Sequence, residues 1–237
     1  MIRAVLFDVT GVLGLPDARW VAARLDELGA RADPARLDRA YYLATAAYDE
    51  QKGGRAPAGQ GPAFGTAYAL GAGLAAGQAR QVEQVLLGPP VPLCHRIPLP
   101  GAESCLRQLA GLGIGIGIVA NTKDGRTSAW LRHWRLGQAV NPAEAGRADG
   151  LVVTDSAVAG VRKPDPRIFT LTLAQLGVPP AEALHVGDSL YLDIEGSRGA
   201  GLRCVHFDPF RLCRRTDHPH AAGLSEVVTH VTQPSLR

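Results

Sequence analysis

The first fourteen residues constrain the fold of this chain more than any other stretch. The apolar run Ala4-Val-Leu-Phe7 ends abruptly at Asp8 and is followed by Val-Thr-Gly-Val-Leu-Gly. An apolar run without polar alternation is typical of a strand buried on both faces of a parallel sheet. In open α/β sheets, ligands bind beyond the carboxyl ends of such strands. We therefore expect Asp8 to face a functional site, although an aspartate that only caps the next turn would give the same local pattern.

The composition describes an ordinary globular protein and excludes several functional classes. The 237 residues include 46% hydrophobic and 20% charged residues, enough for one α/β domain or a core with a smaller insert. The net charge of +3 is small and no basic run is concentrated anywhere, so we expect no nucleic-acid partner. The opening apolar run is too short for a signal peptide, and no stretch of about 18 apolar residues is present to span a bilayer. We expect no membrane association and a cytoplasmic location.

Cysteines and histidines give no clear sign of a metal site in the sequence. Four cysteines occur without C-x-x-C spacing, which indicates buried or incidental thiols: Cys94, Cys105, Cys204 and Cys213. The seven histidines include no H-E-x-x-H pair, so a zinc hydrolase has no support. His218 and His220 are close enough to share a metal. No third ligand stands with them, and we interpret that stretch as a solvated loop.

Residues 15–96 differ from their surroundings because they show helical spacing and no strand pattern. Residues 17–28 form one expected helix, which Gly29 ends. A second begins with Asp33 as N-cap and Pro34 at its first position, and continues toward residue 50. Residues 67–87 are expected to form a third, after a loop over 52–65. Prolines at 89–92 and 98–100 then stiffen the return. We predict a helical lobe, residues 15–96, inserted into a core formed by residues 1–14 and 97–237.

Past the second proline stretch, strands and helices alternate. Such alternation predicts an α/β fold, a doubly wound, Rossmann-like parallel sheet with helices on both faces. The glycines at 113, 115 and 117 fall on one side of a strand and are expected to let another element approach closely. A last element over 224–231 is expected to pack at the sheet edge. The expected strands cover residues 114–119, 151–154, 184–186 and 203–207, and the expected helices cover 102–112, 128–134, 165–176 and about 189–199.

Polar residues follow several of these strands or precede a helix. Asp8, Asn121, Lys163 and Asp188 would converge on one crevice of a doubly wound sheet. Carboxylate oxygens are the ligands that Mg²⁺ prefers, and a lysine can neutralise charge on a transferring phosphoryl group. The pattern indicates a site for a divalent cation and an oxyanion. Taken alone, Lys163 could equally be a solvent-facing residue before the helix that Asp165 caps.

These residues carry a resemblance to a known family. The segments that match it are Asp8-Val-Thr-Gly-Val-Leu13, the strand ending at Asn121, Lys163-Pro-Asp-Pro166, and Gly187-Asp188-Ser189 with Asp193. In order and spacing they resemble the four signature motifs of the haloacid dehalogenase (HAD) superfamily. The match spans most of the chain, and the helical lobe stands where that superfamily inserts its C1 cap.

The resemblance implies a set of roles. Asp8 would be the nucleophile, forming a covalent aspartyl intermediate. Mg²⁺ would be held by Asp8, Asp188 and the backbone carbonyl of Thr10, with support from Asp193. Asn121 and Thr122 would help to bind the phosphoryl group of a small phosphorylated metabolite, and Lys163 would fix both nucleophile and phosphate. Cap residues would select the substrate; the candidates are Tyr41, Tyr42, Lys52 and Arg55, each of which could instead be a packing aromatic or a solvated loop charge.

Two departures from the family pattern leave alternatives open. Thr10 stands where family phosphatases carry an acid/base aspartate, and its loss would raise the barrier by about 3 to 5 kcal/mol. Ala120 replaces the usual hydroxyl residue, although Thr122 could substitute. We expect a Mg²⁺-dependent phosphatase of modest turnover. A binding module for a phosphorylated ligand or a protein partner is the second hypothesis, and a 2-haloacid dehalogenase the third.

Overall fold

The chain divides into two compact units. The computed structural model describes residues 1–53, 63–88, 95–140 and 151–233. The core unit comprises Met1–Gly14, Pro98–Pro209 and Arg215–Arg237. The helical unit comprises Leu15–Ile97 and the short segment Phe210–Arg214. The sequence analysis assigns that short segment to the core, because nothing in its composition separates it from its neighbours.

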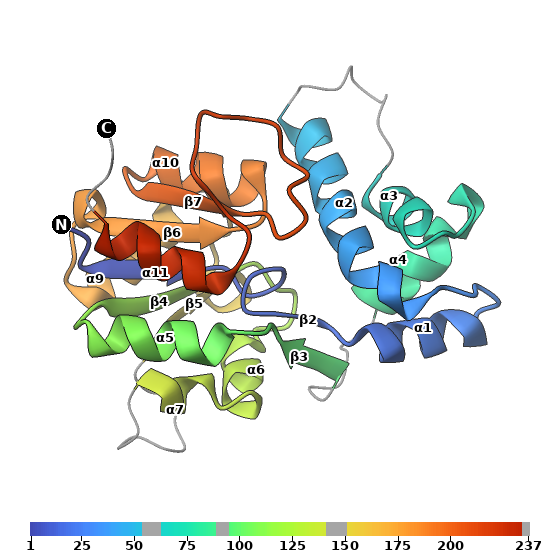
Figure 1. The fold of residues 1–237 in the computed structure, drawn as a ribbon, viewed down its shortest axis with the longest axis horizontal. Helices are drawn as coiled ribbons and strands as arrows, with labels where there is room; N and C mark the ends of the chain where they lie inside the picture. The colour runs from blue at the N-terminus through green and yellow to red at the C-terminus, as the bar shows by residue number, and fades with distance from the viewer. Residues whose placement is uncertain (54–62, 89–94, 141–150, 234–237) are drawn as a thin grey trace. The chain divides into compact units, whose positions relative to one another are not determined.

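The core unit is built on a six-stranded sheet in which every described pairing is parallel (Figure 1). The strand order reverses at β1, where β4 and β6 pair on opposite sides. All four residues of β1 are buried, as its unbroken apolar run predicts. The predicted α/β fold with a parallel sheet is confirmed. In spatial order the strands are β5 (Val152–Asp155), β4 (Gly115–Ala120), β1 (Ala4–Phe7), β6 (Ala183–Gly187), β7 (Arg203–Phe207) and β8 (His220–Ala221).

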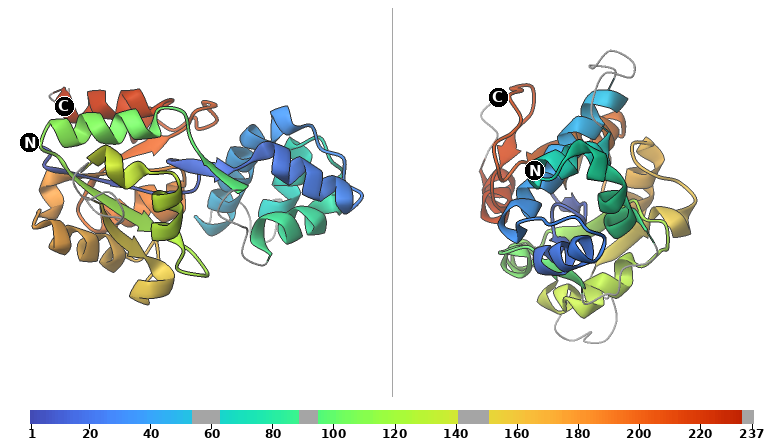
Figure 2. Two further views of the ribbon diagram at one scale, coloured as in Figure 1. Left: turned by 90° about the horizontal axis from the view of Figure 1, so that it is seen from below. Right: turned by 90° about the vertical axis from the view of Figure 1, so that its right-hand side faces the viewer.

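Helices cover both faces of this sheet (Figure 2). Helices α5 (Ala102–Gly111) and α11 (Leu224–Thr232) lie on one face, and α9 (Pro166–Leu176) lies on the other. The apolar side of α9 packs on the buried residues of β1 and β4, in one hydrophobic cluster. The remaining helical segments are α6 (Thr127–His133), α7 (Leu136–Val140), α8 (Ser156–Ala159), a π-helical turn (Leu190–Glu195) and α10 (Gly196–Gly199); the sequence analysis missed α7 and α8, which are too short for a periodic signal.

Gly117 allows α9 to approach the sheet closely. A Cβ atom at this position would lie 2.4 Å from Cδ2 of Leu6 and 2.6 Å from Cγ2 of Thr172. Only a residue without a side chain fits there, as the sequence predicts. At Gly113 no other element comes this close, since nothing lies within 4 Å of its Cβ position. Its φ of 73° is a turn conformation that favours glycine.

The helical unit contains α1 (Ala18–Glu27), α2 (Pro34–Lys52), α3 (Phe64–Gly71) and α4 (Ala79–Leu87). Asp17 and Asp33 cap the first two helices, each accepting backbone N–H groups. The expected single helix over 67–87 is wrong. The chain turns at Gly73, whose φ is 81°, and passes through a 3₁₀ turn (Ala76–Gln78) before α4 begins.

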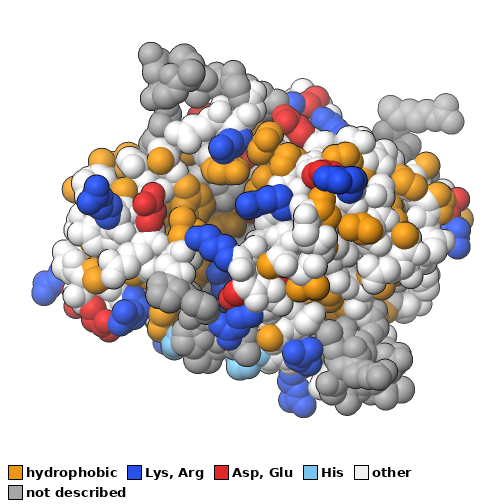
Figure 3. Space-filling view, turned by 180° about the vertical axis from the view of Figure 1, so that it is seen from behind, with side chains coloured by type: hydrophobic (Ala, Val, Ile, Leu, Met, Phe, Trp, Pro, Cys, Tyr) orange, Lys and Arg blue, Asp and Glu red, His pale blue; other side chains and the backbone are white. Residues whose placement is uncertain are grey.

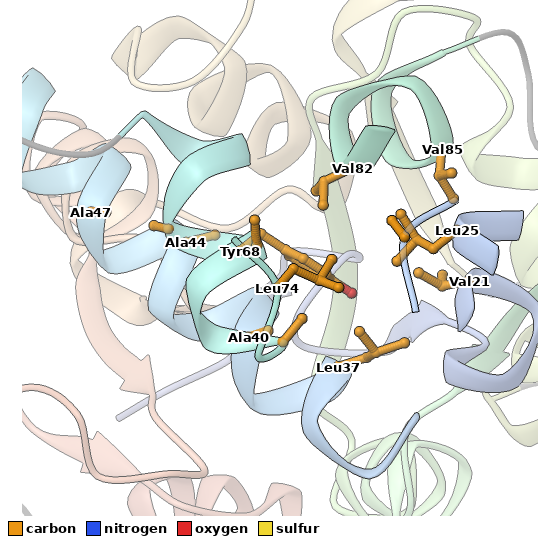
Figure 4. Close-up of a cluster of buried hydrophobic side chains, with 14 residues drawn as sticks. Val21, Leu25, Leu37, Ala40, Ala44, Ala47, Tyr68, Leu74, Val82 and Val85 are labelled. Atoms are coloured by element: carbon orange, nitrogen blue, oxygen red, sulfur yellow. The ribbon is translucent and has the colours of Figure 1, made fainter. Parts of the chain in front are cut away.

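A shared hydrophobic cluster holds the four helices together (Figure 4). Val21 and Leu25 of α1 meet Leu37 of α2, Tyr68 of α3 and Val82 of α4 in this cluster. These residues recur at helical spacing, so each helix contributes one apolar face. The helical unit therefore has a core of its own.

The chain crosses between the units at two short paired strands. These are β2 (Gly14–Pro16) and β3 (Arg96–Pro98). The sequence analysis expected no strand there, because three-residue pairings leave no recognisable pattern. The prolines at 89–92, Cys94 and Arg55 lie outside the described residues. Among the helices that the structure describes, none is both long and apolar enough to cross a membrane.

Candidate functional site

Asp8 lies directly beyond the carboxyl end of β1 and contacts Lys163. Its backbone N–H donates to the carbonyl of Val186 (2.9 Å), which continues the ladder to β6. The Nζ atom of Lys163 lies 2.8 Å from Oδ1 of Asp8 and 2.7 Å from Oδ1 of Asp193. Lys163 is only 2% exposed, so its ammonium group is held between two carboxylates and does not face solvent. Its alternative interpretation as a solvent-facing lysine is wrong.

Asp188 completes a group of three carboxylates at the ends of β1 and β6. One oxygen from each of Asp8, Asp188 and Asp193 lies within 4.8 Å of the others. Three acidic side chains therefore share this region with one lysine, an excess of acidic over basic groups. Hard oxygen donors in this number suit Mg²⁺, which would neutralise that excess. The donor set therefore fits the metal that the sequence pattern suggests.

The electrostatics follow from burial and from this pairing. Burial raises the pKa of Asp8, with Lys163 acting in the opposite direction. Burial alone would lower the pKa of Lys163, but Asp193 and Asp8 outweigh it and hold that pKa above its ordinary value. Burial would raise the pKa of Asp193, yet Lys163 and His185 lower it well below the usual range. Lys163 is thus charged and Asp193 ionised.

Asn121 follows β4 and binds the backbone of Lys163. Its Nδ2 atom donates to the carbonyl of Lys163 (3.0 Å), and its Oδ1 atom accepts from the N–H of Lys163 (2.9 Å). The amide group thus holds the lysine segment next to the strand end. The sequence analysis expected this side chain to face a phosphoryl group. It did not predict the contact with Lys163, because the two residues are 42 positions apart in the sequence.

Thr122 also makes contacts within the protein. Its hydroxyl donates to Oδ1 of Asp155 (2.5 Å) and accepts from the N–H of Gly125 (3.0 Å). Asp155, at the end of β5, is buried and also accepts from Thr127 and Ala157. The carboxylate is therefore satisfied by four donors and fixes the loop after β4. Asp155 is a residue that the sequence analysis missed, although its place at a strand end was a usable signal.

Thr10 lies in the tight turn after Asp8. The carbonyl of Val9 accepts the N–H groups of Val12, Leu13 and Gly14, and Thr10 forms a bridge to Gly14. This turn carries the chain from β1 into β2. Thr10 is half-buried, and it stands two residues after Asp8 on the same turn.

His185 is a second residue that the sequence analysis did not single out. It is fully buried on β6, and its Nε2 atom lies 2.9 Å from Oδ1 of Asp193. Its ring meets Phe169 of α9 edge to face, with centroids 4.9 Å apart. The backbone N–H of Ser189 donates to the other oxygen of Asp193 (3.2 Å). Asp193 is thus oriented from three directions. A histidine inside an apolar strand was the available signal.

Three of the four candidate substrate-selecting residues, Tyr41, Tyr42 and Lys52, lie in the described part of the helical unit. The rings of Tyr41 and Tyr42 meet edge to face at 5.4 Å, and Tyr42 also lies 5.5 Å from the ring of Phe210. The ammonium group of Lys52 lies 5.9 Å from the ring of Tyr48. These contacts are those of packing aromatics and a partly stacked lysine.

Comparisons with known proteins agree with this fold. A family model for haloacid dehalogenase-like hydrolases matches residues 2–201. A phosphoglycolate phosphatase from Rhodospirillum rubrum is 32% identical over 210 residues, which cover 86% of this chain and 79% of that enzyme. A phosphoserine phosphatase from Thermus thermophilus is 46% identical over 116 residues, or 48% of this chain and 42% of that enzyme. The match thus spans only about half or less of several curated relatives.

A solved structure has the same fold over its whole length. The HAD phosphatase from Thermococcus onnurineus superimposes with a TM-score of 0.57, covers 98% of both chains and is 19% identical. At that identity the likeness concerns the fold.

Proposed function

Because this chain belongs to the haloacid dehalogenase-like hydrolases, we propose that it is a Mg²⁺-dependent phosphatase acting on a small phosphorylated metabolite. The observation that carries the proposal is the buried group formed by Asp8, Lys163, Asp188 and Asp193. It combines a carboxylate nucleophile, a fixed positive charge and a donor set for a hard cation. Relatives named as phosphatases of small phosphate esters support the same reaction class.

The reaction would proceed by two displacements at phosphorus. A carboxylate oxygen of Asp8 attacks the phosphorus atom, and the bond from phosphorus to the ester oxygen breaks with both electrons going to the leaving alcohol. Water then attacks the aspartyl phosphate, which releases inorganic phosphate and restores Asp8. The ammonium group of Lys163, 2.8 Å from Asp8, would stabilise negative charge on the phosphoryl oxygens in both steps.

Asp8, Asp188 and the carbonyl of Thr10 are the groups we assign to Mg²⁺. The cation would supply charge neutralisation between the attacking carboxylate and the phosphoryl oxygens. Asp193 lies in the same group, but its oxygens already accept from Lys163 and Ser189 and contact His185. We therefore assign Asp193 mainly to holding Lys163, and only secondarily to the metal.

Thr10 predicts slow turnover. A carboxyl group two residues after the nucleophile could protonate the leaving alcohol and later activate water. A threonine hydroxyl is too weak an acid and too weak a base for these two roles near neutral pH. The leaving group would then take its proton from solvent. This costs about two to four orders of magnitude in rate.

The helical unit, with its own hydrophobic core, is proposed to act as the C1-type cap that selects the substrate. Apolar and charged side chains both occur on the face drawn in Figure 3. The small net charge of +3 supports a small-molecule substrate over a polynucleotide. We propose a cytoplasmic location for this activity.

A binding module is the second candidate, and one observation favours it. Asn121 and Thr122, which were expected to hold phosphate, are engaged with Lys163 and Asp155. These two side chains would then not be available to donate hydrogen bonds to a phosphoryl group, which would weaken catalysis of phosphoryl transfer. The group of three carboxylates argues against the 2-haloacid dehalogenase hypothesis, because carbon–halogen hydrolysis by an aspartate needs no divalent cation.

Phosphate release from a panel of small phosphate monoesters with Mg²⁺ tests the proposal. We expect slow release by the wild type, none by Asp8→Asn, and release at least about tenfold faster by Thr10→Asp. Thr10→Ser is the matched control and should stay at the wild-type rate. EDTA should stop release reversibly. Unchanged hydrolysis by Asp8→Asn would refute the nucleophile, and stable binding of an ester that stays intact would favour the binding module.

A further inference from the structure

A second cluster of metal-binding side chains lies beside the carboxylates. Among the described residues, His206 of β7 and His218 and His220 of the β7–β8 connection and β8 each place one ring nitrogen within 4.8 Å of the others. His206 and His218 are buried. The expectation of a solvated loop at His218 and His220 is therefore wrong, because His218 is buried and His220 belongs to β8.

The sheet register brings these histidines together. β7 and β8 pair in parallel with His206 opposite His220, and the N–H of His206 donates to the carbonyl of Pro219 (2.9 Å). His218 lies in the bend just before β8, and its ring stacks on that of His220. The ring centroids lie 4.6 to 5.3 Å apart. The cluster is thus fixed by backbone pairing.

His218 and His206 each have one nitrogen at hydrogen-bonding distance from an outer partner, and the third ring, that of His220, lies farther from its nearest carboxylate. Nδ1 of His218 lies 3.0 Å from Oδ1 of Asp217, and Nε2 of His206 lies 3.1 Å from the carbonyl of Asp188. Nδ1 of His220 lies 3.8 Å from Oδ2 of Asp208. Metal-binding histidines show this arrangement, in which a carboxylate or carbonyl fixes the tautomer.

The inner nitrogens have the spacing of metal ligands. Nε2 of His218 lies 3.3 Å from Nδ1 of His206. Two nitrogens bound to one tetrahedral zinc at 2.0–2.1 Å lie about 3.3 to 3.4 Å apart. Nε2 of His220 is buried without a hydrogen-bond partner in the described part of the chain.

We propose that His206, His218 and His220 form a zinc site distinct from the acidic group that would hold Mg²⁺. Imidazole ligands suit zinc, whereas carboxylates suit magnesium. The fourth ligand would be water. With zinc on Nδ1 of His206, its Nε2–H group donates to the carbonyl of Asp188. The bound ion would therefore position the segment that carries Asp188, a role that rests on the proposed function.

Zinc stoichiometry tests the site independently of phosphatase activity. The full chain is stripped with a chelator, dialysed against zinc in excess Mg²⁺, and its zinc content is measured by mass spectrometry, with affinities from calorimetry. We expect one zinc per wild-type chain and a loss of affinity exceeding about 100-fold in His206→Asn and in His220→Asn, more than removal of an outer partner alone costs. Because both His206→Asn and His220→Asn are measured, the test remains informative if one of these variants does not fold.

The controls separate this site from others. His133→Asn, which changes an exposed histidine on α6, should bind one zinc as the wild type does, and so should Asp188→Asn. Zinc should also raise the melting temperature of the wild type and not that of His220→Asn. The proposal is overturned if the wild type binds no zinc, if the histidine variants bind it equally well, or if only Asp188→Asn loses it. The three rings would then be a packed cluster, with His218 stacked on His220 and one contact between His218 and His206.

Discussion

Single side chains in the core unit connect segments that are far apart in the sequence. The side chain of Asn121 makes two hydrogen bonds with the backbone of Lys163. The ammonium group of Lys163 in turn bridges Asp8 and Asp193. Removing a partner from a buried polar group costs more than the bond itself contributes, because the remaining group stays desolvated. The position of the lysine therefore depends on an amide that need not touch the substrate.

Replacing Asn121 should affect stability as well as activity. Asn121→Ala removes both hydrogen bonds to Lys163, and we expect a loss of about 1 to 3 kcal/mol in the free energy of unfolding, measured with urea. Asn121→Asp keeps the acceptor for the Lys163 N–H but turns the donor into a second acceptor facing a carbonyl. It should be no more stable than Asn121→Ala. Full stability with a raised KM in both variants would show instead that Asn121 serves only the phosphoryl group.

At the scale of elements, the end of β6 depends on close approach of the turn that follows it. A Cβ atom on Gly187 would lie 2.2 Å from both Cβ and Cγ of Asp193. The π-helical turn, Leu190–Glu195, begins at the N-cap Ser189 and returns Asp193 to this position. Strand, turn and lysine are thus packed around one carboxylate, and no side chain fits at Gly187.

Gly187→Ala should displace Asp193 and release Lys163. We expect a loss of about 1 to 3 kcal/mol of stability from overpacking, with a large fall in phosphate release. Gly111→Ala at the end of α5 is the matched control, because nothing lies within 4 Å of its Cβ position. That variant should be unchanged or up to about 1 kcal/mol more stable. Equal effects of the two substitutions in thermal and urea denaturation would contradict the close-approach argument.

At the scale of the whole molecule, buried charge links stability to the divalent cation. The acidic group holds three acidic side chains and one lysine, an excess of acidic over basic groups in the folded core unit. A cation that binds the folded state and not the unfolded chain stabilises by RT ln(1 + [L]/Kd). This holds whether or not the chain turns over a substrate.

Mg²⁺ should therefore stabilise the wild type measurably. At 100 times its Kd, we expect a gain of about 2.7 kcal/mol in the free energy of unfolding, reversed by EDTA. Asp188→Asn should lose most of this gain, whereas His133→Asn should keep it. Differential scanning calorimetry with and without Mg²⁺ gives the comparison. The acidic group would not be a metal site if Mg²⁺ stabilised Asp188→Asn as strongly as the wild type.

The sequence by itself determined the elements whose signals are local. The apolar run before Asp8 marked the central strand, and Asp33 and Asp165 marked helix starts, because a capping side chain bonds to its own backbone neighbours. The resemblance to a known family also depended only on the order of short motifs. Features of this kind can be predicted from neighbouring residues alone, without knowing which other elements pack against them.

Only the tertiary structure decided which distant groups meet. Asn121 and Lys163 are 42 residues apart, and His206 faces His220 only because β7 and β8 pair in one register. The helix break at Gly73 had a local signal in the glycines at 71, 73 and 77, but the helical spacing on either side did not show where the chain would turn. Partner choice depends on long-range register and on burial, where an unpaired polar group is costly. The cost of burying an unpaired polar group depends on the folded surroundings, so it cannot be read from the spacing of residues along the chain.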